Sequence, residues 1–141
     1  VNVIEQNLDG GLSNFQDSSF DMVVMTETLQ SVRAPDQTLK EMLRIGEECI
    51  VTFPNFGHWR CRAQLLSVGR MPISRDLPHA WFDTPNIHLC TCKDFEQLCG
   101  ALGLRIIHRR VVSPHYNESK WISLLPNLLG TTAFYRLGRA K

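Results

Sequence analysis

The sequence predicts a single α/β domain built around an open sheet. Amphipathic helical patterns alternate with short hydrophobic strand patterns along most of the chain. The strand candidate at residues 20–25 is apolar at all but one position, which is typical of a parallel strand buried on both faces. The last two strand candidates have no predicted helix between them, which favours an antiparallel pair. We therefore expect a mostly parallel sheet with an antiparallel C-terminal edge.

The composition excludes several classes of protein. The chain has 141 residues, of which 43% are hydrophobic and 21% charged, as in ordinary globular domains. A net charge of +1 with no Lys/Arg block argues against nucleic acid or a membrane as partner. No apolar run is long enough to cross a bilayer and no leader pattern is present, so we expect a cytoplasmic protein.

The five cysteines are odd in number and form no C-x-x-C pair, which argues against a disulfide framework and a structural zinc site. We expect reduced thiols and no metal ion. His88, Cys90 and Cys92 alternate along the chain, but a helix begins at Thr91 and no fourth ligand has suitable spacing. Neither Cys90 nor Cys92 has a histidine–acid relay beside it that would make it a nucleophile.

Besides the strand at residues 20–25, the first half of the chain predicts two further strands and one helix. Residues 1–6 are β-branched and end at a turn-forming cluster, residues 7–11, so they predict a short strand. Residues 35–45 predict a helix, because they begin with proline, carry an acid in the first turn and stop before a glycine. The apolar face of this helix is formed by Leu39, Met42 and Leu43. A second buried strand is expected at residues 48–53.

The second half predicts two more helices and two strands. One helix is expected at about residues 58–67, and a second follows the capping pair Thr91 and Asp94. Strands are expected at 104–112 and 131–137. The helix at about residues 58–67 takes its apolar surface from Trp59, Ala63, Leu65 and Leu66. The helix after Thr91 has apolar residues at Phe95, Leu98, Cys99 and Leu102.

Residues 77–91 combine aromatics, histidines, an acid and prolines without apolar periodicity. A loop of this composition usually serves a function. Trp81 and Phe82 have three readings: a lid over a substrate pocket, an anchor in a partner surface, or side chains folded onto the sheet edge. His79 and His88 are candidates for an acid or base because imidazole titrates near neutral pH, and each has a purely structural reading as well.

Several runs carry a resemblance to a known family. Residues 8–10, 17–24 and 29–32 resemble the middle of a class I S-adenosylmethionine-dependent methyltransferase domain. The run Trp-Phe-Asp-Thr-Pro-Asn-Ile-His at 81–88 is narrower, and it resembles the MetW family of methionine biosynthesis proteins. The run Thr-Phe-Pro-Asn-Phe-Gly-His-Trp at 52–59 points the same way.

The resemblance implies a partial Rossmann-like fold of the class I methyltransferase type over the single domain 1–141. It places the start of the chain near the third strand of that sheet, so the domain is expected to be N-terminally truncated. The chain contains no strand followed by a Gly-x-Gly loop and a helix. On this reading the glycine-rich strand-loop-helix lies upstream, and we expect this chain alone to bind S-adenosylmethionine weakly or not at all. The family usually has tyrosine where Phe82 stands.

The resemblance also implies a cofactor site. Asp9 would accept a hydrogen bond from the adenine amino group, and the Gly10 N–H would reach a ring nitrogen. Met25 and Thr26, at the end of their strand, would face the sulfonium and methionine portion. Taken without the family pattern, Asp9 is more simply a turn-former before two glycines.

Two functions are implied. In the first, the protein acts with homoserine O-acyltransferase in methionine biosynthesis. In the second, it is a methyltransferase acting on a small molecule. A third possibility is a fragment without function. The candidate bases for methyl transfer are His58, His79 and His88. The residues expected to contact a substrate or partner are Trp81, Phe82, Asp83, Asn86 and His88.

Overall fold

The computed structural model describes residues 5–74, 77–113 and 120–139. The strands are β1 Phe20–Thr26, β2 Gly46–Pro54, β3 Leu104–Val112 and β4 Thr132–Arg139. The helices are α1 Pro35–Ile45, α2 Trp59–Val68, α3 Cys92–Ala101, α4 Lys120–Leu124 and α5 Pro126–Leu129. Two short 3-10 turns, η1 Leu8–Gly10 and η2 Leu29–Ser31, flank β1.

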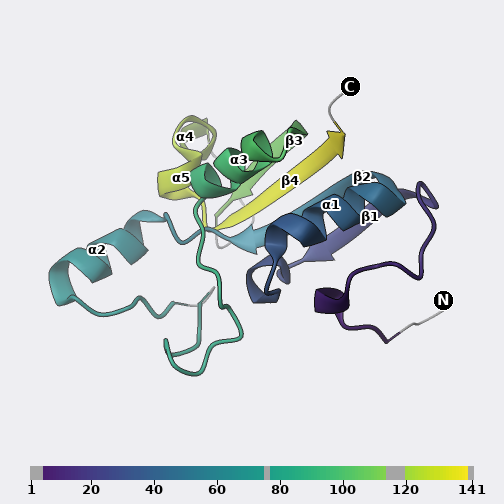
Figure 1. Ribbon diagram of the computed structural model, residues 1–141. Helices are drawn as coiled ribbons and strands as arrows, with labels where there is room; N and C mark the ends of the chain where they lie inside the picture. The colour runs from purple at the N-terminus through teal and green to yellow at the C-terminus, as the bar shows by residue number, and fades with distance from the viewer. Residues whose placement is uncertain (1–4, 75–76, 114–119, 140–141) are drawn as a thin grey trace.

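The strands form one sheet in the order β1-β2-β4-β3 (Figure 1). β1 and β2 are parallel, and β4 lies between β2 and β3, antiparallel to both. The predicted α/β class is therefore confirmed. The prediction of a mostly parallel sheet is corrected for the described strands, because the last strand inserts beside β2 and extends the antiparallel part beyond the edge.

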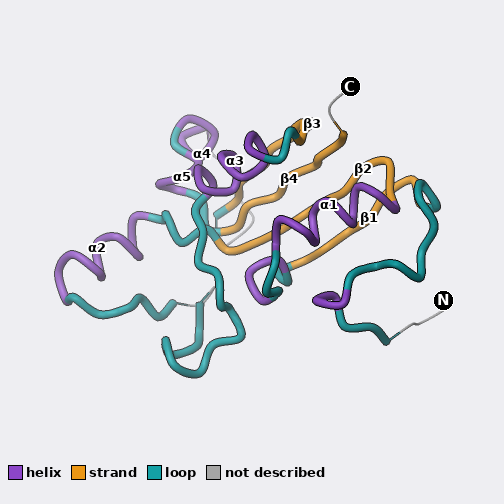
Figure 2. Tube along the Cα trace, in the orientation of Figure 1, coloured by secondary structure: helices purple, strands orange, loops and turns teal. Residues whose placement is uncertain are grey.

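Helices α1 and α3 cover the same face of the sheet (Figure 2). Under α3 the rings of Phe53, Phe95 and Tyr135 form a cluster, with centroids 4.7–5.8 Å apart. The Tyr135 hydroxyl donates a hydrogen bond of 2.9 Å to Glu96, so the one polar atom of the cluster is satisfied. The capping box predicted for Thr91 and Asp94 is present at the start of α3.

β1 is less buried than its apolar sequence predicts. Within the described residues it pairs only with β2, so its other edge is open. Val24 is 59% exposed, and Phe20 and Met22 are exposed as well, whereas Met25 is buried. The prediction of burial on both faces is therefore wrong for the described chain, because α1 covers one face and no described helix covers the other.

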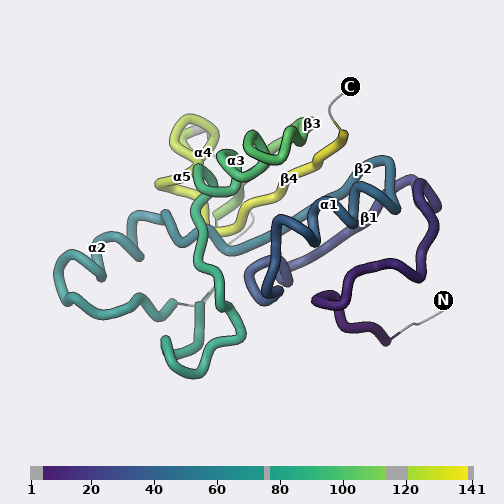
Figure 3. Tube along the Cα trace, viewed as in Figure 1, coloured from purple at the N-terminus to yellow at the C-terminus, as the bar shows by residue number. Residues whose placement is uncertain are grey.

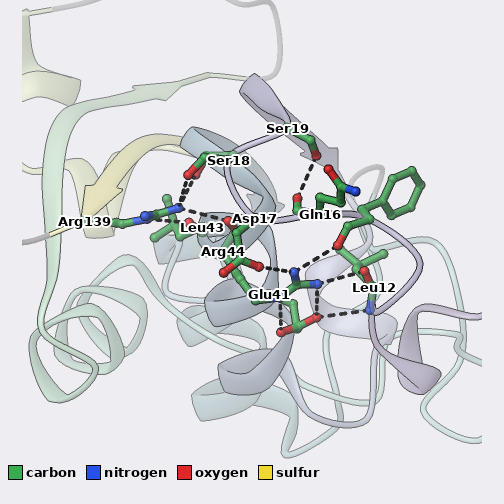
Figure 4. Close-up of polar contacts among 11 residues, drawn as sticks. Leu12, Gln16, Asp17, Ser18, Ser19, Glu41, Leu43, Arg44 and Arg139 are labelled. Atoms are coloured by element: carbon green, nitrogen blue, oxygen red, sulfur yellow. Dashed lines mark hydrogen bonds and ion pairs between the residues drawn. The ribbon is translucent and has the colours of Figure 1, made fainter.

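Arg44, in the last turn of α1, binds the segment before β1 through hydrogen bonds (Figure 4). Its guanidinium donates to both carboxylate oxygens of Glu41 at 2.9 Å and to Asp17 at 2.6 Å. It also donates to the carbonyl oxygens of Leu12 at 2.8 Å and Phe15 at 3.0 Å. The hydrogen bond from Arg44 lowers the pKa of Glu41.

Arg139 and a glycine shape the junction of α1 and β2. The Arg139 side chain donates to the carbonyl oxygens of Leu43 at 2.7 Å and Arg44 at 2.9 Å, which lie at the C-terminal end of α1 (Figure 4). A Cβ at Gly46 would lie 2.6 Å from Cγ2 of Val23, so only glycine lets β2 approach β1 there. These contacts fix where β2 begins.

Most of the chain between β2 and α3 stands away from this body (Figures 1 and 3). We call residues 59–74 and 77–91 the arm. It begins with α2, which confirms the predicted helix with a shift of one residue. The predicted apolar surface is wrong in one respect, because only Cys61 of α2 is buried. The residues expected to pack, Trp59, Ala63, Leu65 and Leu66, are all exposed.

The remaining differences lie at the N-terminus and between the last two strands. Residues 1–4 of the first predicted strand fall outside the described part of the chain, and Glu5 and Gln6 belong to no strand. Helices α4 and α5 were not predicted between the last two strands. Among the described residues, no helix has the length and apolar character needed to cross a membrane.

Candidate functional site

A groove of about 460 Å³ follows β1 on its open side. Leu8 and Leu12 line it from the preceding segment, and Met25 and Thr26 line it from the end of the strand. Of the four predicted cofactor residues, Met25 and Thr26 are thus in the groove, while Asp9 and Gly10 are next to Leu8, in η1. The structure brings the two parts of the predicted site to the same region.

The Asp9 carboxylate is held by a neighbouring loop. Its Oδ1 accepts a hydrogen bond of 2.8 Å from the backbone N–H of Arg33, and its Oδ2 lies 3.7 Å from Nε of Arg33. This contact supports a structural role for Asp9, and it leaves one carboxylate oxygen without a close backbone donor. A Cβ at Gly10 would meet nothing within 4 Å, so there is open space beside this residue.

His88 connects the arm to the same place. Its backbone N–H donates to the carbonyl oxygen of Gln30 at 2.9 Å, and its ring Nε2 lies 3.3 Å from the carbonyl oxygen of Arg33. Because a carbonyl oxygen only accepts, this contact requires a proton on Nε2. Asp9 and His88 therefore contact the N–H and the C=O of one residue, Arg33, which the sequence did not single out.

Two residues just after β1 were missed by the sequence prediction. Glu27 has φ +48°, a strained value for a residue other than glycine, and its N–H points to the carbonyl and hydroxyl oxygens of Thr52 at 3.0 and 3.1 Å. Gln30 is buried, and its Oε1 has no hydrogen-bond partner among the described residues. Strain and an unpaired buried acceptor both occur at functional sites.

No sequence pattern announces a positive φ at a glutamate, so Glu27 had no signal. Gln30 lies in the 29–32 run that carried the family resemblance, and its position there was the only hint.

A second groove, also of about 460 Å³, lies within the arm. Met71 and Leu77 line it together with Trp81, and its polar groups include His79 and Asn86. The Trp81 and Phe82 rings meet edge to face with centroids 5.8 Å apart. They are 74% and 75% exposed, which contradicts the reading that they fold onto the sheet edge and leaves the lid and the partner anchor.

The other residues of the predicted loop make local contacts. The Asp83 N–H donates to Ala80 O at 3.1 Å, and the Asn86 N–H donates to the hydroxyl of Thr84 at 3.1 Å. Both backbone contacts are typical of turns, so they order the loop around Trp81.

The three candidate bases do not converge. His58 is buried at the N-cap of α2, where Nδ1 accepts a hydrogen bond of 3.4 Å from Arg60 N, which is a structural contact. His79 lines the groove of the arm and His88 lies near Arg33.

Cys90 and Cys92 are unsuited to nucleophilic catalysis. Burial raises the pKa of Cys90 to about 12 and that of Cys92 to about 11, so both thiols keep their protons at neutral pH. All five cysteines are free. Within the described ranges, no group of three or more metal-ligating side chains could hold an ion.

Asn55, in the 52–59 run, fixes the base of the arm. Its Nδ2 donates to Gly130 O at 2.8 Å and to Asn127 O at 3.1 Å, and its Oδ1 lies 3.0 Å from Gly57 N and 3.4 Å from Cys92 N. One buried amide thus joins α5, the start of the arm and the start of α3. Residues 52–59 therefore have a structural role that the sequence alone does not reveal.

Solved structures show which class the fold belongs to. A SAM-dependent methyltransferase from Thermotoga maritima, described as a possible histamine N-methyltransferase, matches 99% of this chain with a TM-score of 0.64 at 17% identity. A SAM-dependent methyltransferase from Methanosarcina mazei matches 95% with a TM-score of 0.60 at 20% identity. This chain spans 65% of each of those chains. The fold is that of the class I SAM-dependent methyltransferases.

The sequence comparison identifies the family. Residues 1–137 match the family described as methionine biosynthesis protein MetW, and the chain belongs to that family. A bifunctional methionine biosynthesis protein MetXA/MetW from Rhodopirellula baltica is 36% identical over 107 residues, which is 75% of this chain. The chain spans only 17% of that relative.

Proposed function

We propose that this protein acts in methionine biosynthesis as a partner of homoserine O-acyltransferase. The observation that carries the proposal is the Rhodopirellula baltica relative, in which a MetW part and a MetXA part share one polypeptide. Joining two modules in one chain raises their effective concentration, which is useful when the modules contact each other. We place this role in the cytoplasm, in keeping with five cysteines that are all free.

We also propose that the full-length protein binds S-adenosylmethionine beside β1. The groove there is lined mostly by apolar side chains, and the open space at Gly10 allows a flat ring to approach the backbone. Asp9 would accept from the adenine amino group, while Met25 and Thr26 would face the methionine portion. The remainder of the site would come from a glycine-rich loop outside these 141 residues, so this chain alone is expected to bind weakly or not at all.

Co-purification tests the first proposal. The full-length protein and the homoserine O-acyltransferase of the same organism are mixed, separated by size, and assayed for acyltransferase activity with and without the MetW protein. We expect a complex and a change in activity. Absence of both would remove the proposed partner.

Calorimetry tests the second proposal, that the full-length protein binds S-adenosylmethionine. S-adenosylmethionine is titrated into the full-length protein and into its Asp9→Ala variant. We expect saturable binding that the variant weakens about tenfold, the loss of one hydrogen bond to a charged group. If both proteins bound S-adenosylmethionine with equal affinity, Asp9 would have only its structural role.

Methyl transfer to a small molecule is the second candidate function. The contact of His88 with Arg33 favours it, because Arg33 also binds Asp9, one of the proposed cofactor residues. Such a transfer needs alignment, and a base only where the acceptor loses a proton. Incubating the full-length protein with methyl-labelled cofactor and a small-molecule cell extract tests it: label transfer that is lost in His88→Ala supports a methyltransferase, and no transfer speaks against one.

A further inference from the structure

Helix α2 carries apolar side chains that the described body does not cover. Leu66 is 91% exposed, and Leu65 and Val68 are exposed as well. An isolated surface helix normally buries its apolar stripe, yet α2 stands away from the sheet (Figure 1). Leaving side chains of this kind in water forgoes the hydrophobic stabilisation that burial would supply.

The aromatic loop lies beside the chain that follows α2. Met71, three residues after α2, and Trp81 line one groove, so the two parts of the arm border the same space. At three-quarters exposure, Trp81 and Phe82 offer on the order of 300 Å² of ring surface for burial. That alone reaches the lower range of the largest apolar patch on a typical monomer, about 300–600 Å².

The α2 part of the arm is positively charged. Residues 59–74 contain Arg60, Arg62 and Arg70 and no Asp or Glu, and Asp83 is the one acid of residues 77–91. Arg60 lies over the ring of Trp59 with Cζ 5.5 Å from its centroid, which holds a cation beside exposed aromatic surface. Arginine and tryptophan are the residues most often found at interface hot spots. The complementary surface is therefore apolar with carboxylates around it.

The helix is formed before any partner arrives. His58 caps its first turn, and Gly69, with φ +65°, ends it through a hydrogen bond of 3.0 Å from its N–H to Leu65 O. Asn55 fixes the chain just before α2 to the body. A docking element that is already ordered loses less conformational entropy on binding.

We infer that the arm is the surface by which this protein binds homoserine O-acyltransferase, with α2 and the Trp81–Phe82 pair seated in an apolar groove bordered by carboxylates. The inference rests on the proposed function, since the fusion in the Rhodopirellula baltica relative supplies the partner. Of the two readings left for Trp81, a lid over a substrate pocket and an anchor in a partner surface, the inference selects the anchor.

Affinity measurements with point variants test the inference. The full-length protein is titrated against the homoserine O-acyltransferase of the same organism at low and at physiological salt. We expect Leu66→Glu and Trp81→Ala each to raise Kd at least tenfold, and the association rate to fall with salt. The matched control is Leu124→Glu on α4, where the side chain is 67% exposed and lies outside the arm, and we expect its Kd to equal that of the wild type. Circular dichroism checks that all variants are folded.

The outcomes separate the two proposals. Wild-type protein that does not bind the acyltransferase overturns the proposed function together with its docking surface. Wild-type binding that Leu66→Glu and Trp81→Ala leave unchanged overturns the inference alone. Binding to vesicles of anionic phospholipid, or formation of a homodimer, that Leu66→Glu abolishes while acyltransferase binding persists would assign the arm to a lipid surface or a second copy, and would also overturn the inference.

Discussion

Helices α1 and α2 have nearly the same length, 11 and 10 residues, but differ in what covers their apolar side chains. α1 buries five residues between the sheet and the segment before β1, while α2 buries only Cys61. The polar contacts differ as well, because Glu41 and Arg44 connect α1 to Leu12 and Asp17. The comparison indicates that α1 belongs to the core, and the exposure of α2 supports the docking role that we infer for it.

The largest expected effect comes from the same substitution in both helices. Leu39→Ala in α1 removes a side chain with no exposed surface, and we expect it to lower the free energy of unfolding by about 2–5 kcal/mol. Leu66→Ala in α2 should change it by about 0.5 kcal/mol or less. Chemical denaturation of both variants measures the difference, and similar losses would show that α2 is part of the core.

The next effect marks the boundary between body and arm. Asn55→Ala leaves the N–H of Gly57 and the carbonyl of Gly130 without their partner, and we expect a loss of about 1–3 kcal/mol. Asn86→Ala, within the arm, is the matched control and should cost under about 0.5 kcal/mol. If Asn55→Ala were as stable as the control, the base of the arm would not be anchored where the structure indicates.

The smallest effect is a pH dependence that belongs to α1. The hydrogen bond from Arg44 lowers the pKa of Glu41 in the folded protein, so the ionised carboxylate favours folding. This stability is present above the unfolded pKa of about 4.3 and is lost as the pH falls through the lowered folded value. Acid titration of the melting temperature measures it. We expect Glu41→Gln to flatten the curve in this window, and an unchanged slope would mean that the pair contributes nothing.

Local patterns predicted the elements well where the cause is local. The first proline and the terminal glycine placed α1 at residues 35–45, and Thr91 with Asp94 placed the start of α3. Strand β3 begins and ends as expected from its β-branched run. Caps, turns and side-chain periodicity act within a few residues, so a single sequence contains them.

Tertiary placement was harder to predict. The apolar residues of β1 and α2 have the pattern of buried elements, but burial depends on which distant segments cover them. The insertion of β4 beside β2 likewise depends on long-range pairing. In the candidate site, Met25 and Thr26 were predicted from their strand-end position and line the groove, and their cofactor role stays a prediction. Arg33, Glu27 and Gln30 were not predicted, because a backbone contact, a positive φ and an unpaired oxygen have no local signature.

Hydrogen exchange on the full-length protein, alone and with homoserine O-acyltransferase, tests most directly the claim that α1 is core and α2 is a docking element. The amides of α1 and β2 should exchange slowly in both samples, because they open only with the whole domain. The amides of α2 should exchange faster than those of α1 in the free protein, because a formed helix that nothing covers opens locally, and they should slow markedly in the complex. Exchange of α2 as slow as that of α1 in the free protein, or exchange that the acyltransferase leaves unchanged, would contradict the account.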